Sequence, residues 1–125
     1  MRKSLRAGIG AIAAVAVLAS GLAAAHAAGA LAVGSCAAYG YAYDFPSSKA
    51  AQAEAMKKCG SSCKNVVTTH KGCAALAVDG HKPCGPNGYA SASKLGAAQN
   101  TALKQCYQYG GKDCVIRAFM CDAKG

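Results

Sequence analysis

The chain has 125 residues, eight cysteines, no tryptophan and a formal net charge of +9 at pH 7. A chain of this length forms one domain with a modest hydrophobic core, which excludes a multidomain organisation. The positive charge favours contact with anionic surfaces such as bacterial envelopes or nucleic acids, although a solvated surface that keeps the protein soluble also accounts for it.

We expect residues 1–27 to be a signal peptide. Three basic residues precede an apolar run over residues 9–25, and Ala25-His26-Ala27 forms an A-x-A cleavage site. The run of about 17 residues is at the short end for a retained membrane helix. Cleavage leaves one domain over residues 28–125 with a net charge of +6. The sequence therefore predicts a secreted or periplasmic protein with no transmembrane segment after signal removal.

A lipoprotein is the less favoured alternative. Val33-Gly34-Ser35-Cys36 loosely resembles a lipidation box, but Cys36 lies well past the apolar run. Its counterpart in an internal repeat, Cys84, cannot be lipidated.

The first predicted elements are a hairpin and a helix. Ala30–Val33 is a small apolar strand, Gly34-Ser35 marks a turn, and a second strand contains Gly40–Tyr43. Lys49–Lys58 consists almost wholly of good helix formers, and Pro46-Ser47-Ser48 supplies a first-turn proline or an N-cap serine.

The first unit closes with the strand Asn65–Thr69, which is rich in β-branched residues. Gly60 ends the preceding helix. We expect the buried stripe of that helix to consist of Ala51, Ala55, Met56 and Cys59. Alanine in this stripe allows the helix to lie close to a sheet.

The same elements recur with a period of about 45 residues, which indicates an internal duplication over about residues 30–73 and 75–121. The strands and the turn of the second unit are Ala75–Val78, Asp79-Gly80, Gly88–Ser91 and Val115–Met120. Its helix is expected to be capped by Ser91 or Ser93. Its buried stripe is Ala98, Ala102, Leu103 and Cys106. We predict an α+β fold in which a duplicated strand–strand–helix–strand unit forms one small disulfide-rich domain.

All eight cysteines are expected in disulfides, because the leader delivers an even number of cysteines to an oxidising compartment. They form two matching sets, Cys36, Cys59, Cys63 and Cys73, then Cys84, Cys106, Cys114 and Cys121. The last two cysteines of each set bracket an extended strand, which is too long for the roughly 7 Å between the Cα atoms of a disulfide. The favoured pairs are Cys59–Cys63, Cys106–Cys114, Cys36–Cys73 and Cys84–Cys121, with bridges between the repeats left open.

One pattern occurs twice in the chain. It consists of the helix that ends in Cys59, followed by Cys63 and by Cys73-Ala74-Ala75-Leu76-Ala77-Val78, and its second copy ends at Cys121. This pattern resembles the bacterial family called domain of unknown function 4189. The resemblance covers nearly all of the expected mature chain. It implies a small exported cysteine-rich fold, and the family has no assigned activity.

No metal or cofactor is expected. Cys59, Cys63, His70 and Cys73 have the residue types of a zinc site, but their spacing fits no common motif, and oxidised cysteine cannot bind zinc as thiolate. Thioredoxin-like chemistry would need a Cys-x-x-Cys motif, which the sequence lacks.

No catalytic centre is expected either. The sequence has no Gly-x-Ser-x-Gly elbow, and His70 and His81 each lie beside a lysine in turn-like or strand-end sequence. The carboxylates beyond the leader are scattered: Asp44, Glu54, Asp79, Asp113 and Asp122. A glycosidase needs two converging carboxylates, for which only Asp44 with Glu54 is a candidate.

Tyr39, Tyr41 and Tyr43 alternate with Gly40 and Ala42, which places three rings on one face of a strand. If the helix packs on the small face, these tyrosines form a candidate binding face for glycans, peptides or unstacked bases. The favoured alternative is that the rings belong to the core. No motif supports specific nucleic-acid binding.

The favoured function is binding without catalysis, with an unknown protein or an anionic envelope component as the partner. The alternative is a secreted inhibitor or effector that acts on another cell's enzyme or surface through the loop His81–Asn87. A small hydrolase is a third and least favoured interpretation.

Overall fold

The computed structural model describes residues 27–122, and the expected signal peptide lies outside them except for Ala27. The elements in chain order are β1 (Ala28–Val33), β2 (Tyr39–Phe45), α2 (Ser48–Cys59), β3 (Asn65–His70), β4 (Cys73–Asp79), β5 (Asn87–Ala92), α3 (Leu95–Gln108) and β6 (Cys114–Cys121). The predicted unit of two strands, a helix and a strand therefore occurs twice, and the α+β fold class is confirmed. No helix within the described residues is long and apolar enough to cross a membrane.

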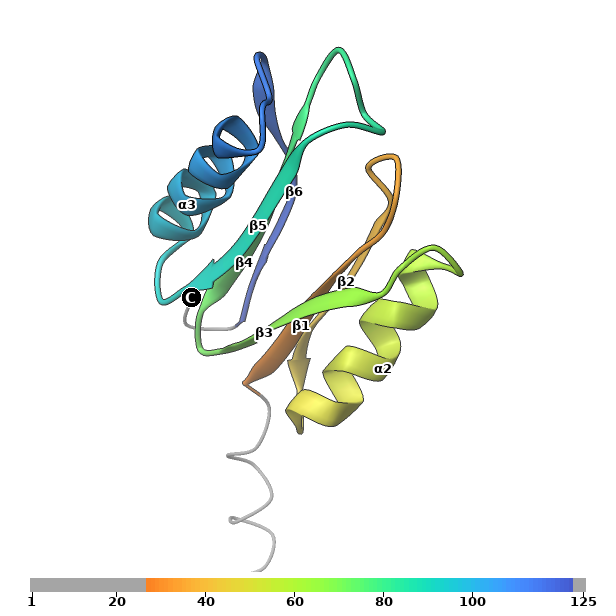
Figure 1. Cartoon of the computed structure of the whole chain (residues 1–125). Coiled ribbons are helices and arrows are strands. Elements are labelled where there is room, and N and C mark those ends of the chain that lie inside the picture. Colours follow the sequence, from red (N-terminus) through yellow and green to blue (C-terminus); the bar gives the residue numbers. More distant parts are fainter. Residues whose placement is uncertain (1–26, 123–125) are drawn as a thin grey trace, which may run out of the picture.

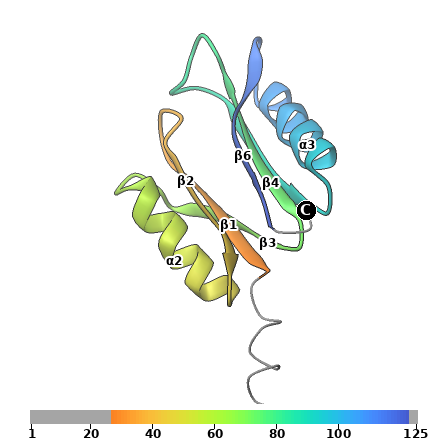
Figure 2. The ribbon, with the colours of Figure 1, turned by 180° about the vertical axis from the view of Figure 1, so that it is seen from behind.

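The two units form two three-stranded antiparallel sheets, with strand orders β2-β1-β3 and β5-β4-β6. α2 covers the outer face of the first sheet and α3 the outer face of the second, so the layers run helix, sheet, sheet, helix (Figure 1). The inner faces of the sheets pack together, with β2 against β6 and β3 against β5. The same sandwich is seen from behind in Figure 2.

β1 and β4 are the central strands of the two sheets. In each of them alanine alternates with larger apolar residues, so one face of the strand is small and the other is bulky. In β1, Ala30 and Ala32 face α2, whereas Leu31 and Val33 enter the core between the sheets. β4 repeats this pattern with its own alanines, leucine and valine. Both central strands are buried along their whole length, because each has a helix on one face and the other sheet on the opposite face.

Glycine permits close contact between helix and strand in both units. A Cβ atom built at Gly40 would collide with the carbonyl oxygen of Ala55, and one built at Gly88 would collide with that of Ala102. The helix backbone therefore lies directly on the small face of the second strand in each unit, which is the condition under which the tyrosines of the first unit point away from the helix.

The first helix begins as predicted, and the second does not. The side-chain oxygen of Ser47 accepts the backbone N–H of Ala50 at 3.1 Å, so Ser47 is the N-cap. The prediction that Ser91 or Ser93 caps the second helix is wrong, because Lys94 is the N-cap and makes no side-chain cap hydrogen bond. Ser91 instead belongs to β5, and Ser93 lies one residue before the cap.

All eight cysteines are bonded in four disulfides. The predicted bridges at the helix ends, Cys59–Cys63 and Cys106–Cys114, are confirmed. The predicted pairs Cys36–Cys73 and Cys84–Cys121 are wrong, because the remaining bridges are Cys36–Cys84 and Cys73–Cys121.

The position of Cys73 explains the error. Cys73 is the first residue of β4, so it belongs to the second sheet, where it lies opposite Cys121 in the ladder with β6. Cys36 and Cys84 lie in the loops that follow β1 and β4, and the packing of the two sheets brings these loops together. Because Cys36 is bonded to Cys84, its sulfur does not carry a lipid in this structure.

Candidate binding surface

The three tyrosines of the candidate face lie on β2, on the side away from α2. Tyr39 and Tyr41 are half-buried against the core between the sheets, whereas Tyr43 is 52% exposed. The Tyr39 and Tyr41 rings are stacked with their centroids 6.2 Å apart, and the Tyr43 ring lies 6.3 Å beyond Tyr41. The row therefore has a packed end and an exposed end, and it is neither wholly core nor wholly surface.

Two cations flank this tyrosine row. The guanidinium carbon of Arg117 lies 5.3 Å from the centroid of the Tyr39 ring, which is a cation–π contact. The ammonium group of Lys58, at the end of α2, donates to the carbonyl oxygen of Tyr41 at 3.4 Å. A depression of about 270 Å³ is lined by Tyr39, Gly40, Tyr41 and Lys58. This combination of rings and positive charge suits a ligand that carries sugar or flat rings together with anionic groups.

Sequence reasoning did not find Arg117, because this residue reaches β2 through an irregularity in β6. Leu76 lies opposite Ala118 and Ala77 lies opposite Ile116, so Arg117 is an extra residue in the strand. A bulge of this kind redirects a side chain. One signal was present in the sequence, since the final strand of the second unit is longer than that of the first.

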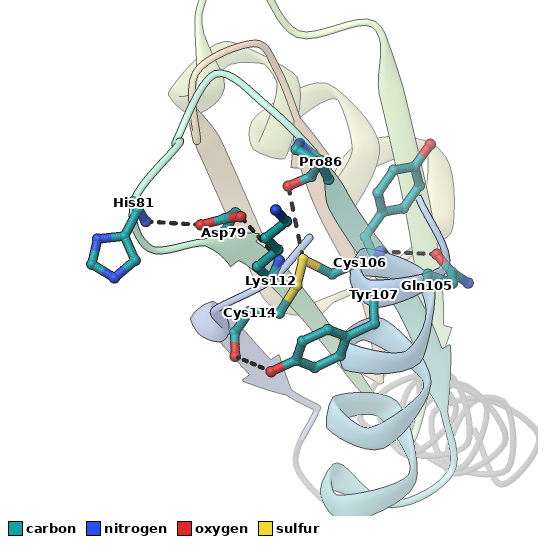
Figure 3. The surroundings of a disulfide bond; sticks show 9 residues. Asp79, His81, Pro86, Gln105, Cys106, Tyr107, Lys112 and Cys114 are labelled. Atoms are coloured by element: carbon teal, nitrogen blue, oxygen red, sulfur yellow. Dashed lines mark hydrogen bonds between the residues drawn. A yellow bond between two sulfur atoms is a disulfide. The ribbon is translucent and has the colours of Figure 1, made fainter. Parts of the chain in front are cut away.

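A polar cluster surrounds Asp79 at the end of β4 (Figure 3). The buried Asp79 carboxylate accepts the backbone N–H of Lys112 at 3.1 Å and that of His81 at 2.9 Å. These hydrogen bonds, that from Lys112 foremost, lower the pKa of Asp79 below its ordinary value. The His81 ring also lies 3.2 Å from the Asp113 carboxylate at the exposed surface. Asp79 thus ties the β4–β5 loop to the α3–β6 loop.

The end of α3 is held to β6 beneath these loops (Figure 3). The Cys106–Cys114 disulfide joins the helix to the strand, and the Tyr107 hydroxyl donates to the carbonyl oxygen of Cys114 at 3.5 Å. These contacts give the Asp79 cluster a structural role as an anchor for the loops.

Asp122 is the second buried carboxylate. It accepts the hydroxyl of Thr69 and, at 3.3 Å, the backbone N–H of Asp44. Both donors belong to the first unit, so Asp122 links the end of β6 to the first sheet. Asp79 and Asp122 lie at opposite ends of the β4–β6 ladder, and they cannot act as the carboxylate pair of a glycosidase.

The remaining candidates for chemistry are dispersed. Both His70 and His81 are exposed, and they lie at opposite ends of the sheets. Glu54 pairs with Lys58 at 3.7 Å. Within residues 27–122, no three His, Cys, Asp or Glu side chains gather as metal ligands.

Comparison with known proteins gives two likenesses. The family model described as "Domain of unknown function (DUF4189)" matches residues 28–121. The chain is also similar to a solved structure, "NMR structure of Rv1813c from Mycobacterium tuberculosis", with 26% sequence identity, a TM-score of 0.56, and coverage of 76% of this chain and 74% of that chain. No curated protein matches the chain significantly. The strands and helices of both units all fall within the matched residues.

Proposed function

Because the chain belongs to the DUF4189 family, a family without an assigned activity, we propose a function from its own geometry: it binds an anionic envelope component outside the cytoplasm, without catalysis. Four disulfides support an oxidising compartment, either the periplasm or the exterior. The observation that carries the proposal is the tyrosine row of β2 with Arg117 and Lys58 beside it.

The duplication supplies an internal comparison for this surface. Tyr39 and Tyr41 lie opposite Val33 and Leu31 in the first sheet. At the matching places of the second sheet, the residues opposite Val78, Leu76 and Ala74 are Asn87, Tyr89 and Ser91. The same scaffold thus folds in the second unit with one tyrosine in this row. We infer that the additional tyrosines of the first unit serve a ligand.

The chemistry of the row indicates the ligand class. Sugar rings pack on the faces of exposed aromatic side chains such as Tyr43, and the cations at Arg117 and Lys58 attract carboxylate or phosphate groups. An acidic envelope glycan combines both features. The charge contacts between such a glycan and the protein weaken as salt rises, because exposed charges are screened over about 8 Å at physiological ionic strength. The contacts between the sugar rings and the tyrosines persist at high salt.

The test compares two exposed tyrosines, Tyr43 in the row and Tyr109, which is 70% exposed at the end of α3. Oxidised exported protein is pelleted with an isolated envelope fraction at low and at high salt. Tyr43→Ala should weaken the salt-resistant binding by about tenfold, the scale of one lost ring-stacking contact. Tyr109→Ala should bind like the wild type. Equal binding by the two variants would show that the row is not the contact surface.

A secreted inhibitor or effector is the second candidate, and the β4–β5 loop favours it. The His81 N–H is held by Asp79, the Gly85 N–H donates to the carbonyl oxygen of Lys82 at 2.8 Å, and Cys84 is bonded to Cys36. A loop fixed in this way loses little freedom when it binds an enzyme. If this candidate is right, Lys82→Ala will lose capture of a protein partner and keep envelope binding.

A further inference from the structure

The four disulfides differ in exposure. Cys36 and Cys84 are both exposed residues. Each of the other bridges has at least one buried cysteine, namely Cys63, Cys73, Cys106 and Cys114. A thiolate that attacks a disulfide must approach one sulfur along the S–S axis, so access is a condition of exchange. Cys36–Cys84 is the bridge that offers this access at both ends.

Cys36–Cys84 also has a distinct place in the sandwich. Cys59–Cys63 lies within the first unit, and the two remaining bridges join elements of the second sheet and its helix. Cys36–Cys84 therefore is the one disulfide that joins the two sheets. The chain joins them at the opposite end, where Lys71-Gly72 connects β3 to β4 (Figure 1). The sandwich is closed at one end by the backbone and at the other by this bond.

We propose that Cys36–Cys84 is a thiol–disulfide exchange site, at which a low-molecular-weight thiol forms a mixed disulfide with Cys84. The thiolate of the small thiol attacks the Sγ atom of Cys84. The Cys36–Cys84 bond breaks, and its electron pair leaves on the Sγ atom of Cys36 as a thiolate. A second small thiol then attacks the sulfur of the first, which releases the oxidised dimer of the small thiol and the Cys84 thiolate. Two small thiols are oxidised, and one protein disulfide is reduced.

The surroundings of Cys36 indicate the direction of attack. Cys36 lines a depression of about 390 Å³ together with Arg117, and the Nε–H of Arg117 donates to the carbonyl oxygen of Ala37 at 3.5 Å. A guanidinium that lines the same depression as the departing sulfur stabilises its negative charge, and a stabilised thiolate leaves faster. Asp79 lines the same depression, but its carboxylate is occupied by the N–H groups of His81 and Lys112. Cys36 is therefore the sulfur better placed to leave, and exposed Cys84 is the sulfur that the incoming thiol attacks.

The backbone at this site is poised to change when the bond opens. Cys36 and Ala37 have φ values of 54° and 66°, in the left-handed region that residues other than glycine seldom adopt. Breaking the bond frees the loop over residues 34–38 and the loop over residues 80–86 from each other. Exchange therefore removes the covalent link at one end of the sandwich, while Lys71-Gly72 keeps the link at the other end.

The experiment treats the oxidised, folded protein with limiting reduced glutathione at mildly alkaline pH. Samples are quenched with acid, free thiols are alkylated, and the peptides are mapped by mass spectrometry. Cys36 should be alkylated, and Cys84 should carry glutathione, about tenfold faster than any other cysteine reacts. Initial opening of another bridge, or equal rates at all four, would overturn the proposal. Glutathione found on Cys36 would overturn the direction of attack.

Two variants sharpen the result. Arg117→Gln should slow the glutathione reaction at Cys84 and leave the slow reaction of the other cysteines unchanged. An unchanged rate would contradict the role of the guanidinium. A variant with both Cys36→Ser and Cys84→Ser should form no rapid adduct, and a rapid adduct in this variant would place the exchange site elsewhere.

Discussion

The ammonium group of Lys58 lies 3.4 Å from the carbonyl oxygen of Tyr41, at the free edge of β2. The second unit has a matching contact, since the side-chain oxygen of Gln105 accepts the N–H of Tyr89 at 3.1 Å, at the free edge of β5. Each residue directly precedes the cysteine that ends the predicted stripe of its helix. An unpaired strand edge can pair with another chain. In both units a helix side chain is hydrogen-bonded to a backbone group with which an added strand would have to pair.

The variant Lys58→Ala with Gln105→Ala should therefore associate with itself more strongly than the wild type. Analytical ultracentrifugation over a range of concentrations measures the change. The unfolding free energy should fall only modestly, because one such hydrogen bond contributes about 1 kcal/mol. Lys57→Ala with Gln108→Ala changes the same residue types at exposed positions of the same helices. Equal association in both variants would mean that edge capping is unimportant.

Gly40→Ala and Gly96→Ala should shift stability in opposite directions. A Cβ atom at Gly40 meets the α2 backbone, so the helix must move away from the sheet, at a cost of about 1–3 kcal/mol. A Cβ atom at Gly96, in the first turn of α3, meets nothing within 4 Å. Alanine there should add about 0.5–1 kcal/mol, because it favours the helix and restricts the unfolded chain. Urea unfolding measures both, and a stabilising Gly40→Ala would contradict the close packing.

Thr69→Val should destabilise the fold by about 1–3 kcal/mol, because it leaves the buried Asp122 carboxylate without the hydroxyl donor. Thr68→Val is the matched control on the same strand. Thr68 is exposed, so its replacement should change the unfolding free energy by less than about 0.5 kcal/mol. Equal effects at the two positions would show that the Thr69–Asp122 hydrogen bond does not matter.

Asp79 should make stability depend on pH. Its folded-state pKa is lowered, so the carboxylate stabilises the fold above the unfolded-state pKa of about 3.9, and this stabilisation is lost as the pH falls through the folded-state pKa. Asp79→Asn should be less stable than the wild type near neutral pH, and the difference should shrink below about pH 4. Urea midpoints from pH 2 to 7 test this. Asp113→Asn leaves the Asp79 hydrogen bonds in place, so the loss of stability below about pH 4 should remain in this variant. A constant difference across this range would refute the assignment.

Local pattern was sufficient to predict the elements. The small apolar strand Ala30–Val33 was found within β1, and Ser47 marked the start of α2, because each signal involves neighbours in the chain. The bridges Cys59–Cys63 and Cys106–Cys114 were predictable for the same reason, since each joins a helix end to a cysteine at, or two residues before, the start of the strand that follows.

What escaped prediction depends on how the two units face each other. The duplication suggested bridges within each repeat, but Cys36 meets Cys84 because the loops after β1 and β4 lie at the same end of the sandwich. Arg117 reaches Tyr39 through a bulge whose register only the assembled sheet defines. Asp122 is buried because donors from the first unit satisfy it, and no pattern near residue 122 encodes those donors.

The arrangement of the two sheets has a consequence for the symmetry of the molecule. β5 is the counterpart of β2 in the second unit, and β6 is the counterpart of β3. If the two units are swapped, the contact of β2 with β6 becomes the contact of β5 with β3, and both contacts are present. This is the relation between the subunits of a two-fold dimer. Cys36 and Cys84 occupy the same position in the two units, and they bond to each other as one cysteine bonds its own copy across a dimer axis. The protein is thus a pseudo-symmetric dimer within a single chain. Because the two halves have separate sequences, a residue such as Tyr43 can specialise one half while the other keeps Ser91.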